Sequence, residues 1–246
     1  MASAAEQLAA NLNFSALAKA DDLKKRIWFT LGALLVYRLG TFIPMPGIDP
    51  VAFANAFNQA RGGILGLFNM FSGGAVERMA IFALNIMPYI SASIILQLLT
   101  TVSPTLEALK KEGEQGRKVI NQYTRYLTVL LAALQAYGIA VGLEGGQGGI
   151  VSNPGWFFRL STVITLTGGT VFLMWLGEQI TARGIGNGIS LIIFAGIVAE
   201  LPGALAGLLE LGRTGGISTA VIIGIILISG APIYFIVFME RPQRRL

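Results

Sequence analysis

The chain has 246 residues, of which 54% are hydrophobic and 13% are charged, and its mean hydropathy is +0.67. These values exclude an ordinary soluble globule and predict an all-α integral membrane protein. The sequence contains no cysteine and no histidine, which excludes disulfide and thiolate chemistry and removes the most common metal ligand and general base. We therefore expect no metal site, no cofactor and no catalytic residue.

Apolar windows predict six membrane crossings, at residues 27–43, 79–99, 123–143, 156–176, 189–205 and 217–239. Residues 1–26 lack the basic start and apolar core of a removable signal peptide, and they predict an amphipathic segment on the membrane surface. Thirteen of the eighteen lysine and arginine residues fall on one side of this topology. By the positive-inside rule, the N-terminus and the C-terminal tail are cytoplasmic.

Arg38 lies within the first predicted crossing, where a charged side chain costs about 2.5–3.5 kcal/mol at mid-membrane. We expect its long side chain to extend toward the outer interface or into a polar cavity. A functional, water-facing arginine is the alternative.

A short apolar segment at residues 62–71 enters the membrane from the outside in this topology. A helix of this length spans about 15 Å, roughly half the hydrocarbon thickness, so it must end inside protein or in a water-filled cavity. Gly73 and Gly74 join it to the apolar run 79–99, in which Pro88 predicts a bend near the middle. This arrangement is typical of a gate.

None of the thirteen acidic residues lies in the middle of a predicted crossing. This pattern argues against proton-coupled pumps and intramembrane proteases, which need ionisable or nucleophilic groups at depth. Sodium-coupled transport through broken helices and backbone carbonyls stays open. Ser93 and Gln97 lie four residues apart, so they share one helix face and either line a crevice or bond a neighbouring helix.

The glycine-rich loop TARGIGNGIS at residues 181–190 lacks the lysine and hydroxyl order of a phosphate-binding loop. Asn187 and Gly188 instead predict a tight cytoplasmic turn before the next crossing. We expect no nucleotide site, so energy for transport must come from partners.

Two long runs carry a family resemblance, FNMFSGGAVERMAIFALNIMPYISASIILQLL at 68–99 and WLGEQITARGIGNGISLII at 175–193, together with segments 38–49, 110–126 and 238–246. They resemble the SecY family, the channel subunits of the bacterial Sec protein translocase, in order over essentially the whole chain. One departure is Asn85, where the family usually has glycine. This position is expected beside the pore constriction, where it affects local packing or the tightness of the seal.

The resemblance implies the first half of an inverted-repeat clamshell, with the five-helix half at 27–205 and the sixth crossing and the start of a cytoplasmic loop at 206–246. It implies a plug helix at 62–72 with the apolar side chains Ile64, Leu65, Leu67, Phe68, Met70 and Phe71. Backbone freedom at the two ends of the plug is assigned to the hinge residues Gly62, Gly63, Gly73 and Gly74. The pore ring is assigned to Ile86, Ile90 and Ile193. Half of a lateral gate is assigned to Pro88, Ser91, Ser93 and Gln97.

The function implied by the resemblance is a protein-conducting channel subunit in the bacterial plasma membrane, which is not an enzyme. It passes unfolded secretory polypeptides across the bilayer and releases transmembrane segments into the lipid. The implied partners are the SecE and SecG subunits, the SecA motor ATPase and the ribosome, and the substrates are signal sequences and nascent polypeptide. Arg241, Arg244 and Arg245 lie at the start of the partner-docking loop. A membrane anchor is favoured over direct partner contact for Arg241, whereas for Arg244 and Arg245 the two roles stay equally open.

Two further function classes stay open beside the channel. An ion-coupled secondary transporter would show saturable uptake of a small solute at a site formed by broken helices. A non-conducting scaffold subunit of a membrane complex would neither take up a solute nor contact a translocating polypeptide.

The family has ten crossings and this sequence predicts six, so we expect that the chain alone leaves the polar wall of the pore open. We predict that it cannot by itself restore secretion to a membrane depleted of the family's channel subunit. Export of a secretory protein in such cells measures this, and recovery of export by the chain alone would contradict the prediction.

Overall fold

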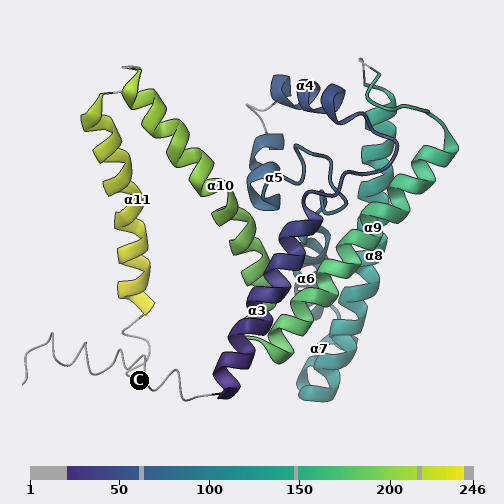
Figure 1. The fold of residues 1–246 in the computed structure, drawn as a ribbon. Coiled ribbons are helices and arrows are strands. Elements are labelled where there is room, and N and C mark those ends of the chain that lie inside the picture. Colours follow the sequence, from purple (N-terminus) through teal and green to yellow (C-terminus); the bar gives the residue numbers. More distant parts are fainter. Residues whose placement is uncertain (1–20, 61–63, 147–148, 215–217, 241–246) are drawn as a thin grey trace, which may run out of the picture. The chain divides into compact units, whose positions relative to one another are not determined.

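The structure is a computed structural model that describes residues 21–60, 64–146, 149–214 and 218–240 (Figure 1). Within these ranges the secondary structure is mainly helical. The β-type pairing in the described residues is limited to two isolated antiparallel bridges, Pro44–Ala80 and Ile48–Val151. The helices are α3 (Asp21–Gly40), α4 (Pro50–Ala60), α5 (Ile64–Ser72), α6 (Met87–Val102), α7 (Pro104–Lys111), α8 (Glu114–Glu144), α9 (Trp156–Arg183), α10 (Gly188–Arg213) and α11 (Thr219–Glu240).

The chain divides into two compact units, one up to Val198 and one from Ala199 onward. The boundary lies within α10, shortly before Pro202, which stands inside that helix. The second unit comprises the rest of α10 and the apolar helix α11, which also contains an internal proline, Pro232. The cavities and side-chain contacts described below belong to the first unit.

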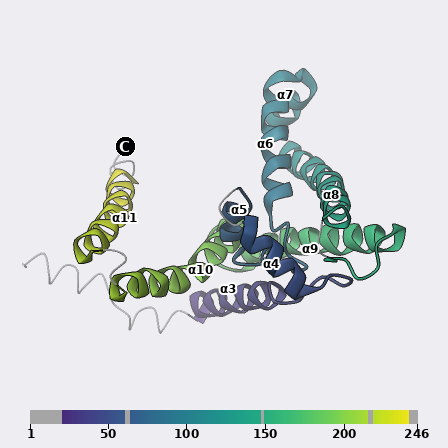
Figure 2. The ribbon, with the colours of Figure 1, turned by 90° about the horizontal axis from the view of Figure 1, so that it is seen from above.

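The long helices α8 and α9 form the centre of the first unit, with α6 packed on α8 and α3 packed on α9 (Figure 2). One face of α8 is buried at every fourth position by small residues, namely Thr124, Thr128, Ala132, Ala136 and Ala140. Such a stripe lets helix backbones approach closely, which is how helices associate where lipid removes the usual hydrophobic driving force.

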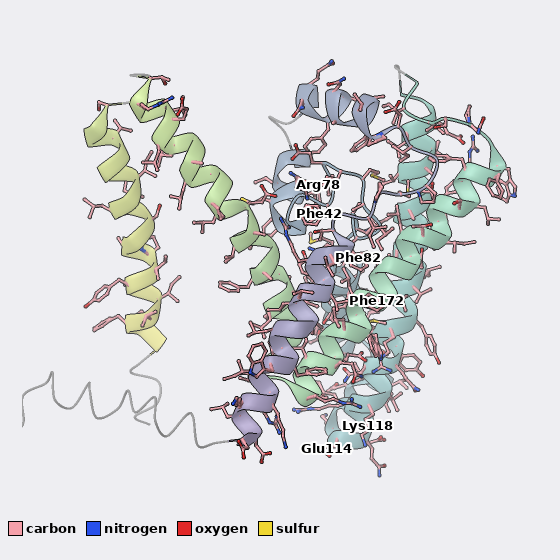
Figure 3. The ribbon with its side chains drawn as sticks, viewed as in Figure 1. Phe42, Arg78, Phe82, Glu114, Lys118 and Phe172 are labelled. Carbon is pink, nitrogen blue, oxygen red and sulfur yellow. The ribbon has the colours of Figure 1, made fainter. Side chains whose placement is uncertain are left out.

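Aromatic rings join α3 to α9 through the segment between α5 and α6. The Phe82 ring stacks on Tyr37 of α3 at 6.3 Å between centroids and on Phe172 of α9 at 5.8 Å. Trp175 continues this series one turn along α9, at 5.8 Å from Phe172. Figure 3 labels Phe82 and Phe172 within this core. Stacked pairs of this kind contribute about 0.5–1.5 kcal/mol beyond their buried area.

The expected crossing at 79–99 is wrong in its first third, because residues 79–86 form successive turns rather than helix. Met79 and Asn85 have φ values of +43° and +49°, a left-handed conformation that interrupts a helix. The expected mid-span bend at Pro88 is also wrong. Pro88 lies in the first turn of α6, where its missing N–H costs no intrahelical hydrogen bond.

Three described helices, α8, α9 and α10, are long and apolar enough to cross a membrane, and a fourth span results if α6 and α7, bent by 100°, count as one. The count of six crossings therefore remains a prediction. α3 ends at Gly40, three residues before the expected end of the first crossing. The expected surface segment falls mainly at residues 1–20, which lie outside the described residues.

The expected turn before α10 is confirmed. Residues 184–187 are non-helical, and the Asn187 side-chain oxygen accepts hydrogen bonds from the N–H groups of Ile189 and Ser190 at 3.0 and 3.3 Å. Asn187 thus caps α10. Gly188 is the first residue of the helix rather than part of the turn, and a Cβ there would collide with the carbonyl of Gly177 on α9.

Two adjacent glycines on α9, Gly168 and Gly169, offer a matched test of how closely α9 packs against the turns at 79–86. A Cβ on Gly169 would collide with the carbonyl oxygen of Ile81, whereas a Cβ on Gly168 meets nothing within 4 Å. We predict that Gly169→Ala lowers the free energy of unfolding by about 1–3 kcal/mol through overpacking. Gly168→Ala should leave it unchanged or raise it by up to about 1 kcal/mol. Thermal unfolding in detergent measures both, and equal stabilities would contradict the close approach.

Candidate functional site

The short helix α5 is the feature around which the candidate site is built. Its nine residues span about 13 Å, which is less than half of a bilayer's hydrocarbon thickness. The last carbonyl groups of a helix lack partners within it, so a helix that ends away from water needs donors from elsewhere. α5 ends at Ser72, which is buried together with the following residues up to Ala75.

Three side chains from outside α5 donate hydrogen bonds to the backbone carbonyls where it ends. Asn85 Nδ2 donates to the carbonyl of Phe71 at 2.7 Å. The Tyr37 hydroxyl donates to Ser72 at 3.3 Å, and Arg38 Nη1 donates to Gly73 at 2.6 Å. The positive charge of Arg38 also suits the negative end of the helix dipole. We call these three residues the α5 cap.

The joint after α5 is a packed turn. Asn69 binds across it, because its side-chain oxygen accepts from the N–H of Glu77 at 2.9 Å and its side-chain nitrogen donates to a carboxylate oxygen of Glu77 at 3.2 Å. Gly73 and Gly74 have φ values of +63° and +82°. A Cβ on Gly73 would lie 3.0 Å from the Cα of Gly196 in α10, so only glycine fits this contact without displacement.

Arg38 does not simply extend toward an interface, because its side chain binds the joint after α5. Its guanidinium also lies 4.9 Å from the centre of the Phe42 ring, over which the guanidinium of Arg78 lies at 4.4 Å. Figure 3 labels Arg78 and Phe42 beside the end of α3. Sequence reasoning missed this role, since the acceptor is a backbone carbonyl 35 residues away.

The structure brings Ile86, Ile90 and Ile193 together on one cavity of about 270 Å³. Ile86 precedes α6, Ile90 lies one turn later, and Ile193 comes from the first unit's part of α10. The rest of the lining comes from Phe71, Asn85 and Met87. The side chains assigned to the ring therefore face one apolar space that borders the end of α5.

The other side chains assigned to the plug are only partly described. Leu67, Phe68 and Met70 are exposed, with accessible fractions of 58%, 41% and 41%, and Phe71 is half-buried. Gly62 and Gly63, as well as the side chains of Ile64 and Leu65, lie outside the described residues. Arg241, Arg244 and Arg245 lie outside them as well.

A second cavity of about 490 Å³ lies between α5, the turns at 79–86, α6 and α8. Ser91, which was assigned to the lateral gate, lines it together with Gln135 of α8, Phe68 and Asn85. The other gate residues follow along α6. Pro88 is buried, Ser93 is half-buried and Gln97 is exposed.

A third cavity of about 490 Å³, to which several polar side chains contribute, lies near the other end of α8 and α9, and sequence reasoning missed it. Arg125 of α8 and Glu178 of α9 form a two-pronged ion pair there, with N–O distances of 2.9 and 2.8 Å. Tyr89, Asn121 and Asn187 are also in the lining. In the described part of the chain, no group of three or more acidic side chains gathers that could hold a metal ion.

Comparison with known proteins identifies relatives over most of the chain. The family model described as SecY matches residues 80–246. The protein translocase subunit SecY of Escherichia coli K12 is 57% identical over 227 residues, which are 92% of this chain and 51% of that protein. The corresponding subunit of Vibrio cholerae is 55% identical over 94% of this chain and 52% of its own length. The chain thus spans about half the length of these relatives.

Two solved structures share the fold, each with a TM-score of 0.50 and 19% identity over 77% of this chain and 38% of the other. One is described as Sec61 in the canine ribosome–channel complex from the endoplasmic reticulum. The other is described as the structure of a protein conducting channel.

From the contacts of the α5 cap, we predict that removal of Arg38 destabilises the fold more than removal of the neighbouring Arg78. Arg38→Met should lower the free energy of unfolding by about 1–3 kcal/mol, because the carbonyl of Gly73 loses its charged donor. Arg78→Met is the control, since the exposed Arg78 reaches the Gly74 carbonyl only at 3.4 Å, and less than about 1 kcal/mol is expected. Denaturant unfolding followed by circular dichroism measures both, and an equal loss would contradict the specific role of Arg38.

Proposed function

Because the chain belongs to the SecY family, we propose that it forms part of a protein-conducting channel in the bacterial plasma membrane. The channel passes unfolded secretory polypeptides across the bilayer and releases transmembrane segments into the lipid. It is not an enzyme, and the energy for movement comes from partners.

One observation carries this proposal, namely the common cavity lined by Ile86, Ile90 and Ile193. A ring of aliphatic side chains excludes water and ions by dewetting, and it offers no directional bonds that would retain a passing polypeptide. Branched side chains are stiff, so they keep the constriction narrow while the elements that carry them remain able to separate. The three isoleucines come from two separate elements, α6 with its preceding turn and α10.

α5 serves as the plug of this channel. Phe71 at its end lines the same cavity as the three isoleucines, so displacement of α5 would open that side of the constriction. The contacts that seat it include three hydrogen bonds from the α5 cap and two between Asn69 and Glu77 across the joint. Gly73 and Gly74, already in left-handed conformations, provide the hinge at its C-terminal end.

α6 forms one side of the lateral gate. Ser91, Ser93 and Gln97 offer polar contacts along a predominantly apolar helix. Such contacts in membranes contribute about 0.6 kcal/mol each and up to about 2 kcal/mol. These contacts would therefore add a small amount to the free energy needed to open the gate toward lipid, without preventing it from opening.

The proposed topology has six crossings with a cytoplasmic N-terminus, which follows from the distribution of lysine and arginine. On this side the proposed partners are the SecA motor ATPase and the ribosome, with Arg244 and Arg245 in the docking loop. SecE and SecG are the proposed companion subunits. A basic loop suits acidic protein surfaces and the phosphates of ribosomal RNA.

The test uses a chimera in which this chain replaces the region that it matches in the E. coli relative. This chain has no cysteine, and any cysteine in the E. coli part of the chimera is replaced by serine, so single cysteines at Ile86, Ile90 and Ile193 give unambiguous positions. Leu134→Cys is the control, since this exposed residue of α8 does not line the isoleucine cavity. We predict that a secretory polypeptide arrested in transit crosslinks to the three cavity positions and not to position 134.

Two outcomes would overturn the channel assignment. Absence of crosslinks at all three cavity positions, with saturable uptake of a small solute, would favour a transporter. Absence of both activities would favour a scaffold subunit.

A further inference from the structure

Asn85 is a buried polar side chain in a left-handed backbone conformation beside the isoleucine cavity. Its φ of +49° lies in the left-handed region, where glycine is the residue without steric cost and asparagine the best tolerated alternative. Its exposed fraction is 3%. It immediately precedes Ile86, and it borders both cavities that flank α5.

The side chain of Asn85 makes one hydrogen bond and leaves one group unpaired. Nδ2 donates to the carbonyl of Phe71 at 2.7 Å, which is a short contact across 14 residues. Oδ1 is buried without a partner in the structure. A buried acceptor without a partner destabilises the folded state. A glycine here would avoid both this cost and the backbone strain, so local folding alone does not favour asparagine.

We propose that Asn85 is a latch that holds α5 in its seated position and couples its release to movement of the isoleucine ring. The hydrogen bond between Asn85 and Phe71 is observed in the structure. The inference that this bond helps keep a channel closed rests on the proposed function. Of the three cap residues, Tyr37 and Arg38 belong to α3, but Asn85 adjoins the ring residue Ile86. A shift of the backbone that moves Ile86 out of the constriction therefore moves Asn85 away from Phe71.

The alternative role for Asn85 is that of a turn residue, and two substitutions separate it from the latch. Asn85→Gly removes the side chain and relieves the left-handed backbone. Asn85→Asp keeps the shape and the tolerance for this conformation but replaces the amide donor with a carboxyl group. In its ionised form this group cannot donate to the Phe71 carbonyl, so the unsubstituted protein and both variants are compared at an alkaline pH that keeps it ionised. If Asn85 is only a turn residue, Asn85→Gly should leave the amide protons of α5 as protected from exchange as before, or more so. If Asn85 is a latch, both variants should lower this protection.

Hydrogen–deuterium exchange of the chimera described above, in lipid nanodiscs, measures this directly. We expect exchange in peptides covering residues 64–74 to rise about 3- to 10-fold in both variants, the range expected for loss of one hydrogen bond. Peptides covering 128–140 of α8 are the internal control and should not change. Unchanged or slower exchange at 64–74 in Asn85→Gly would overturn the latch. If that variant does not fold, the same result in Asn85→Asp would do so.

Ion conductance across planar bilayers separates the latch from the channel function. If the channel conducts at rest more often in the variants and α5 exchanges faster, both proposals are supported. Faster exchange in a protein that never conducts supports the latch and counts against the channel. Unchanged exchange in a conducting channel overturns the latch and leaves the channel standing.

Discussion

The structure depends on satisfying backbone hydrogen bonds where the chain is neither helical nor in water. Residues 73–86 run as turns through the interior of a protein whose composition is that of a membrane protein. Such backbone is tolerated in membranes only where protein surrounds it and supplies partners. Local turns provide part of the bonding, and the strand-like segment at 43–45 provides more, since Met45 N–H donates to Met79 at 3.0 Å and Ile81 N–H donates to Ile43 at 3.0 Å.

This constraint produces two parts of different stability within the first unit. α8 and α9 make the most extensive helix–helix contact, and one face of α8 is a buried stripe of small residues that allows neighbouring helices to pack closely. α5 instead depends on side-chain donors from α3 and from the turn before α6, each bond worth about 1 kcal/mol, or more from the charged Arg38. A rigid pair of helices beside a short helix held by a few breakable contacts is the arrangement that a gated pathway requires.

The positions of most helices could be predicted from the sequence because they follow from the lengths of its apolar runs. The long helices α8, α9 and α10 and the short helix α5 are each visible as apolar runs, and Asn187 signals its turn. Residues 79–86 could not be recognised as turns, since a buried irregular segment is as apolar as a helix. Pro88 did hold a signal, because proline favours the first helical turn. The cap formed by Tyr37, Arg38 and Asn85 had none, because its acceptors are backbone carbonyls distant in sequence.

We propose that α5 rests over an apolar constriction that is dry while the channel is closed. The most direct measurement is the rate at which a membrane-impermeant thiol reagent modifies Ile86→Cys in the chimera. This chain has no other cysteine, and any cysteine of the E. coli part is replaced by serine. We predict that the cysteine at position 86 is modified negligibly at rest, where Ile86 is 1% exposed. It should be modified rapidly once a polypeptide occupies the channel. Rapid modification at the same rate in both states would contradict the proposal.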